Sequence, residues 1–185
     1  MSIRKFLTSH IRGAINPDDL ANFGTNLKYL YNEGDLCDIP WTTVRQSNVT
    51  VSFDSSKISM TASSGIKCGC ISTYEPISLA NYTKLVMYCS CNVGTETGFT
   101  YLVEALCKTN DWYPGSSDSK LYHRLQSSDQ IGHTGTFPWT YLIMDLTASP
   151  MEFVSSCPVE SFINLALYST SSSGSAYIKR VFLVP

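Results

Sequence analysis

The sequence predicts an all-β fold, an antiparallel jelly-roll β-sandwich with a short N-terminal arm that is helical or extended. Segments of alternating apolar and polar residues recur at short intervals beyond residue 30, separated by turns rich in Ser, Gly, Asn and Thr. No segment in that part of the chain keeps an apolar period of 3.6 residues, so a helical body is not expected. Many short strands joined by polar turns are typical of a sandwich or barrel.

The strand expected over residues 84–91 is the centre of this fold. Its apolar positions Leu85, Met87 and Cys89 alternate with Val86, Tyr88 and Ser90, and a period of two marks a pleated strand. Because both faces are rich in apolar or aromatic residues, we expect a central position in a sheet. The further strands predicted from alternation are residues 49–53, 57–62, 66–72, 99–108, 120–125, 140–146, 162–168 and 176–184.

The first 28 residues differ from the rest of the chain. They carry apolar residues at helical spacing until Pro17 interrupts the pattern, and these residues are Ile3, Phe6, Leu7 and Ile11. Two interpretations stay open, a helix that covers one end of the sandwich and an arm that docks the module to a larger assembly. We assign residues 1–28 to a docking arm and residues 29–185 to the β-sandwich.

Composition excludes several classes of function. The 185 residues, enough for one domain, carry 13 Lys and Arg against 15 Asp and Glu, a net charge of −2. That balance offers no basic surface to a nucleic acid, so no nucleic-acid partner is expected. No apolar run is long enough to span a bilayer, and the N-terminus has no secretory apolar region, so neither membrane insertion nor secretion is expected.

The cysteines suggest a reducing compartment. There are 7 of them, and an odd number suits a disulfide scaffold poorly. Cys68 with Cys70, and Cys89 with Cys91, form two Cys-x-Cys pairs whose side chains share a strand face. Four sulfurs that met could bind zinc, and a disulfide is a third interpretation, but we favour buried thiols and expect no metal and no cofactor.

No catalytic pattern is evident. The histidines His10, His123 and His133 are far apart in the sequence, and no nucleophile elbow, phosphate loop or metalloprotease motif is present. A glycosidase needs two placed carboxylates, and the sequence does not single out a pair. We therefore predict that the chain is not an enzyme.

The loop over residues 109–118 is the best ligand-binding candidate. It holds two adjacent aromatic residues among amides and carboxylates, the kind of side chains that stack on a sugar ring and bind its hydroxyls. The predicted glycan-binding residues are Asp111, Trp112, Tyr113 and Asp118. The alternative is that Trp112 or Tyr113 only caps the end of the sandwich. Trp41 and Trp139 each follow a proline, and we interpret them as core or rim anchors, with Trp41 in a loop.

The order of segments resembles a known family. An opening loop at residues 31–35, a hairpin with residues 57–62, the segment from Pro76 to Leu85, residues 139–146 and a closing strand at residues 176–183 follow one another. This order resembles the jelly-roll modules of tailed-bacteriophage structural proteins, which are similar in fold to carbohydrate-binding modules. Ser78 stands where the family more often has Asp.

The resemblance implies a function of attachment without catalysis. On that basis we expect a bacteriophage virion protein that decorates a head, tail or fibre, made in the bacterial cytoplasm and homo-oligomeric, with a trimer as one option. Its partners would be other virion proteins, reached through the N-terminal arm, and a host-surface glycan. The alternatives are a stand-alone carbohydrate-binding protein and a β-sandwich glycan hydrolase. Fold alone does not decide between them.

Overall fold

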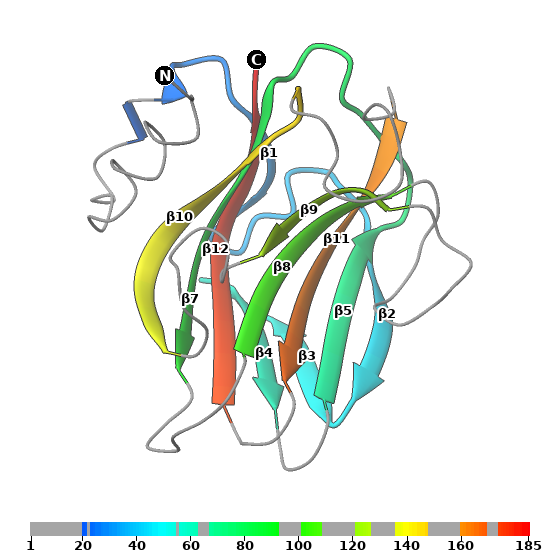
Figure 1. Cartoon of the computed structure of the whole chain (residues 1–185), viewed down its shortest axis with the longest axis vertical. Coiled ribbons are helices and arrows are strands. Elements are labelled where there is room, and N and C mark those ends of the chain that lie inside the picture. The colour runs from blue at the N-terminus through cyan, green and yellow to red at the C-terminus, as the bar shows by residue number, and fades with distance from the viewer. Residues whose placement is uncertain are drawn as a thin grey trace, which may run out of the picture.

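The computed structural model describes residues 20, 21, 23–54, 56–62, 67–92, 101–108, 121–126, 136–147, 160–169 and 174–185. In these parts of the chain most residues are in strands (Figure 1). The strands are β1 (Lys28–Asn32), β2 (Trp41–Ser47), β3 (Val49–Phe53), β4 (Ile58–Ala62), β5 (Lys67–Thr73), β6 (Ile77–Ser78), β7 (Lys84–Asn92), β8 (Tyr101–Lys108), β9 (Leu121–Gln126), β10 (Phe137–Asp145), β11 (Glu160–Ser169) and β12 (Gly174–Val184).

The strands form two antiparallel sheets, which confirms the predicted β-sandwich. Sheet A has the order β10-β7-β12-β4-β3, and β1 pairs with the free half of the β12 edge beyond β4. Sheet B has the order β2-β5-β11-β8-β9, and the short β6 also pairs with β11. Each sheet joins strands from both halves of the chain, as the mixed colours of Figure 1 show. The strand β7 is central in sheet A, as its sequence predicted.

The main core lies between the sheets. On β7, Leu85, Met87, Cys89 and Cys91 point inward and are nearly inaccessible to solvent. Alternating residues of the other strands meet them there, among them Ile71 of β5. Burial of aliphatic side chains between two stacked sheets, typically about 10 Å apart, supplies the main stabilisation of such a fold.

A second apolar cluster covers part of the outer face of sheet A. It consists of Val86, Tyr88, Tyr141, Phe182 and Val184, which the alternation of β7, β10 and β12 turns away from the main core. The segment before β1 packs on it through Leu20, Phe23 and Leu27, with Tyr29 of β1. The described end of the N-terminal arm therefore lies against the outside of the sandwich, and not between the sheets.

Two sequence expectations about loops are wrong. Tyr31 and Asn32 belong to β1, not to an opening loop, and Tyr31 is fully buried. Trp41 begins β2, where its indole Nε1 donates a hydrogen bond to the carbonyl oxygen of Leu30 at 3.2 Å. The β2 strand lies at the edge of sheet B and is dominated by polar residues, so apolar alternation did not reveal it.

Candidate ligand-binding face

The predicted site residues lie outside the described residues. This applies to the glycan-binding candidates Asp111, Trp112, Tyr113 and Asp118, and to the docking candidates Ile3, Phe6, Leu7 and Ile11. Both assignments stay predictions. The described residues instead show a different candidate surface, on the outer face of sheet A.

The part of this face that the N-terminal segment leaves uncovered is rich in hydroxyl groups. Cross-strand register places outward-facing residues of five neighbouring strands in adjacent rows, from β3 to β10. We call this surface the hydroxyl face, and it consists of Thr50, Ser52, Ser59, Thr61, Ser90, Asn92, Trp139, Ser175 and Tyr177. Most of these side chains are exposed or half-buried, and Ser59 and Ser90 lie nearly flush with the sheet at 9% and 8% exposure.

Two aromatic rings stand on the hydroxyl face. Tyr177 of β12 pairs with Ser90 of β7, and on the other side of β7 a bulge in β10 places Trp139 at the level of Ser90. The bulge contains Pro138, which cannot donate a ladder hydrogen bond and is tolerated at such an irregularity. Neighbouring strands are about 4.8 Å apart, so the two residues stand roughly 10 Å apart across the sheet.

A lysine lies over each of these rings. Lys179 Nζ is 4.9 Å from the centroid of the Trp139 ring, and Lys57 Nζ is 4.5 Å from that of the Tyr177 ring. The register of β12 against β7 shifts between Ile178 and Arg180, so Lys179 occupies a bulge. The bulge redirects its side chain across β7 toward Trp139. Both lysines therefore make cation–π contacts at the protein surface.

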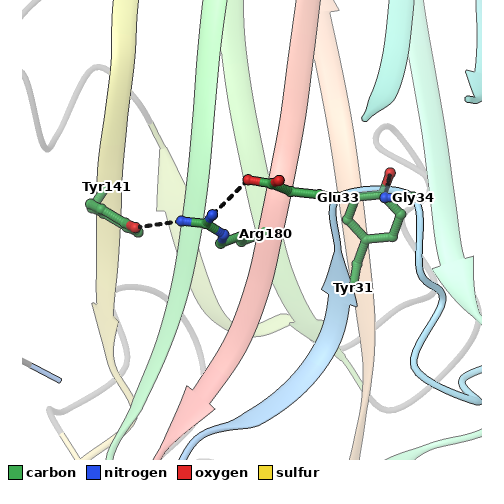
Figure 2. Close-up of polar contacts among 5 residues, drawn as sticks. All are labelled: Tyr31, Glu33, Gly34, Tyr141 and Arg180. Atoms are coloured by element: carbon green, nitrogen blue, oxygen red, sulfur yellow. Dashed lines mark hydrogen bonds and ion pairs between the residues drawn. The ribbon is translucent and has the colours of Figure 1, made fainter. Parts of the chain in front are cut away.

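Side-chain contacts of Arg180 connect the outer face of sheet A to the loop after β1 (Figure 2). Its Nη2 donates to Glu33 Oε1 at 2.6 Å, and its Nη1 donates to the Tyr141 hydroxyl at 3.3 Å. Burial alone would lower the pKa of Arg180, but the bond to Tyr141 and the charge of Glu33 outweigh it and raise that pKa. Burial has the opposite effect on Tyr141 and raises the pKa of its hydroxyl. The guanidinium is thus a neutralised structural charge.

The loop that carries Glu33 is itself fixed. Glu33 and Gly34 have left-handed backbone conformations, with φ of 49° and 93°, a region that costs a non-glycine residue some strain. The amide of Gly34 donates to the hydroxyl of Tyr31 at 2.8 Å, and the amide of Glu33 donates to the carbonyl of Lys179 at 2.6 Å. Burial raises the pKa of Tyr31 to about 12. These bonds hold the Glu33 carboxylate beside Arg180.

An aromatic stack supports Trp139 from the side. Tyr88 lies 5.2 Å from Trp139 and 4.4 Å from Tyr141, measured between ring centroids. Tyr88 and Tyr141 are buried, whereas Trp139 is half-buried at the exposed end of the stack. Since offset aromatic pairs add about 0.5–1.5 kcal/mol each beyond their burial, the stack holds the indole in one orientation.

Cys70 does not meet the Cys89 and Cys91 pair, and the side chain of Cys68 lies outside the described part of the structure. Cys89 and Cys91 point into the core between the sheets, whereas Cys70 is buried on the outer side of sheet B, where its Sγ lies 3.7 Å from Asn164 Oδ1. Burial raises the pKa of the Cys89 thiol well above its ordinary value and that of Cys91 to about 12. The described residues contain no cluster of His, Cys, Asp and Glu that could hold a metal ion.

The hydroxyl face is chemically suited to binding. Aromatic rings, hydroxyls and an amide can stack on a sugar and exchange hydrogen bonds with it. Glycoside hydrolysis needs a pair of carboxyl groups flanking the bond, and none of the nine described residues that define the face is Asp or Glu. Within the described ranges, no helix has the length and apolarity needed to cross a membrane.

Sequence reasoning missed this face for a topological reason. Tyr177 lies in a predicted strand and Trp139 directly precedes one, but nothing in the sequence says that β10 and β12 flank β7. A weaker signal was present in the polar members of the alternating strands, because Ser and Thr occupy every outward position of β3 and β4 that the face uses.

Comparison with known proteins identifies the fold. No protein-family profile matches the chain, and no curated protein is similar to it in sequence. The structure is similar to a family 11 carbohydrate-binding module of the cellulosomal cellulase Lic26A-Cel5E of Clostridium thermocellum, with a TM-score of 0.51 and 6% identity over 87% of this chain and 95% of that one. At this identity the likeness shows a shared fold alone.

Two further matches with lower TM-scores are also carbohydrate-binding modules. A family 29 module from Piromyces equi gives a TM-score of 0.46 and 9% identity over 85% of this chain and 89% of that one. A xylan-binding module from Roseburia intestinalis gives 0.46 and 7% identity over 86% and 95%. Of these three matches, the family 11 module alone exceeds a TM-score of 0.5.

Proposed function

We propose that this protein is a non-catalytic carbohydrate-binding module that binds a glycan chain on the hydroxyl face. The observation that carries this proposal is the pairing of Trp139 and Tyr177 across β7, on a surface otherwise made of hydroxyl and amide side chains. The jelly-roll fold, shared with a carbohydrate-binding module, supports it as an analogy.

The geometry favours an extended ligand that runs across the strands. The two aromatic residues lie on one line over β10, β7 and β12, and the hydroxyls of β4 and β3 continue that line. Their spacing of roughly 10 Å is comparable to the length of a disaccharide unit. Each ring can therefore stack on an alternate sugar, while Ser90 bonds to a hydroxyl between the rings and Ser59 to one beyond Tyr177.

The bacteriophage role remains a prediction. It depends on the resemblance in the order of sequence segments, and the comparisons offer it no support. The same holds for docking through residues 1–28, the homo-oligomer and the virion location. A stand-alone glycan-binding protein needs only the face described here, so we prefer that simpler assignment.

The test is electrophoresis through gels that contain soluble polysaccharides, which retard a protein that binds them. We expect at least one polysaccharide to retard the wild-type protein. Trp139→Ala and Tyr177→Ala should each weaken binding by roughly tenfold or more, because loss of a stacking ring costs about 1–3 kcal/mol. Tyr74→Ala is the matched control, because Tyr74 is 68% exposed in the loop between β5 and β6. Equal binding by all three variants would refute the assignment of the site.

A further inference from the structure

The two lysines on the hydroxyl face make no salt bridge within the described ranges, where neither Lys179 nor Lys57 has a carboxylate oxygen within 4.0 Å. Asp54 precedes Lys57 in the β3–β4 turn. Hydrogen bonds from Ser56 and from the backbone amide of Lys57, and to a lesser extent the charge of Lys57, lower the pKa of the Asp54 carboxyl. Lys57 therefore lies near one carboxylate without forming an ion pair with it. Each lysine is instead placed over an aromatic ring.

This placement affects neutral and acidic sugars differently. An ammonium group lies over one face of each ring, so a sugar that stacks on that face of Trp139 or Tyr177 meets it. A neutral sugar displaces the ammonium and gains no charge interaction in return. An acidic sugar can stack while its carboxylate keeps the displaced ammonium nearby as an ion pair, so the cation–π contact is exchanged for a charge-assisted hydrogen bond.

From this we infer that the hydroxyl face selects acidic glycans, with Lys179 beside Trp139 and Lys57 beside Tyr177 each binding a uronate carboxylate. The inference rests on the proposed function and names the ligand class of that site. The arrangement is also repetitive, because each ring has a lysine over it and the two rings are on strands separated by one strand, β7. A polymer with acidic groups at a regular interval fits two such units.

The experiment compares polygalacturonate with its fully methyl-esterified form, which keeps the backbone and removes the charge. We expect the wild-type protein to bind polygalacturonate, and to bind the ester at least tenfold more weakly. Lys179→Met and Lys57→Met should each weaken binding of polygalacturonate by about two- to fivefold, the range of an exposed ion pair, and the double variant by roughly tenfold. Raising the salt concentration should weaken wild-type binding and leave the double variant less affected.

Lys84→Met provides the matched control. Lys84 is at the opposite end of β7 from Ser90, so the substitution makes the same change of charge on the same sheet, and binding should not change. Equal binding of the acid and its ester, or binding of neutral glycans alone, would overturn the inference and leave the proposed function intact. No retardation by any acidic or neutral polysaccharide would overturn both.

Discussion

Arg180 of the last strand donates a hydrogen bond to the carboxylate of Glu33, a residue 147 positions earlier in the chain, at 2.6 Å. The contact lies within sheet A, where β1 pairs with β12, and it fixes the loop after β1 to an interior strand of that sheet. It also neutralises the arginine, whereas Lys179 and Lys57 beside the hydroxyl face make no salt bridge within the described ranges and lie over aromatic rings instead.

Substitution of Arg180 should cost more stability than substitution of its partner. Glu33 is 41% exposed, and an exposed ion pair contributes about 1 kcal/mol at most, so Glu33→Gln should lower the free energy of unfolding by less than that. Arg180→Met keeps much of the aliphatic packing but also removes the charged hydrogen bond to Tyr141, so we expect a loss of roughly 1–3 kcal/mol. Urea unfolding of both single variants and the double variant measures the coupling, and equal costs for the two would contradict the structure.

Gly69 allows the two sheets to approach each other. A Cβ atom at this position of β5 would lie 2.5 Å from Val49 Cγ1 and 3.3 Å from Val51 Cγ2, both on β3 of the opposite sheet. Because a β-branched side chain has little freedom to move away, Gly69→Ala should destabilise the fold by about 1–3 kcal/mol. Thermal unfolding would show this.

Val49→Ala tests whether that close approach is the cause. Alone it removes buried methyl groups and should cost about 1–3 kcal/mol. Combined with Gly69→Ala, it frees the space that the new Cβ needs, so the double variant should be more stable than the sum of the two costs predicts. Strict additivity would mean that the loss in Gly69→Ala has another origin.

The alternation of apolar and polar residues predicted most of the strands, but it could not reveal short or irregular ones. The strands β3, β4 and β7 alternate cleanly, and the predicted segments coincide with the observed ones to within about two residues. The β1 strand escaped detection because it is short and a bulge between Tyr29 and Tyr31 breaks its period. These failures are local.

The candidate face could not be predicted, because it depends on which strands are neighbours. Trp139 and Lys179 come together only because β7 lies between their strands and each of those strands has a bulge in the same part of the sheet. A bulge moves a side chain by one position relative to the partner strand, and no single residue type in the sequence predicts where a bulge will form. The sequence pointed instead to adjacent aromatic residues in one loop, a purely local signal.

The segment before β1 should be part of the stable fold. Phe23 lies 5.5 Å from Tyr141 and 5.4 Å from Phe182, measured between ring centroids, and it covers the outer cluster of sheet A. Phe23→Ala should therefore lower the free energy of unfolding by roughly 2–4 kcal/mol, whereas Ala21→Ser, at an exposed position two residues earlier, should change it by less than about 0.5 kcal/mol.

Truncation extends this prediction. Removing residues 2–28 would expose Val86, Phe182 and Val184, so we expect a destabilised product that aggregates more readily than the full chain. Size-exclusion chromatography and thermal unfolding would measure it. A truncated protein as stable as the full chain would show that residues 2–28 serve only for attachment, as a docking arm would.

Stability should fall on the alkaline side because of the core thiols. Burial raises the pKa of Cys91 to about 12, while an unfolded thiol has a pKa of about 8.5. Above pH 8.5 the unfolded chain therefore loses a proton that the folded chain keeps, and the folded state loses up to about 1.4 kcal/mol per pH unit from this group. The stabilisation of the folded state that comes from the protonated Cys91 thiol is fully present below pH 8.5 and disappears as pH rises toward 12. In Cys91→Ala the free energy of unfolding in urea should fall less steeply with pH between pH 8.5 and 10 than in the wild type. Met87→Leu is the control, because it changes the same core without a titratable group and should keep the wild-type pH dependence. The same pH dependence in all three proteins would mean that Cys91 is ionised or accessible in the folded state.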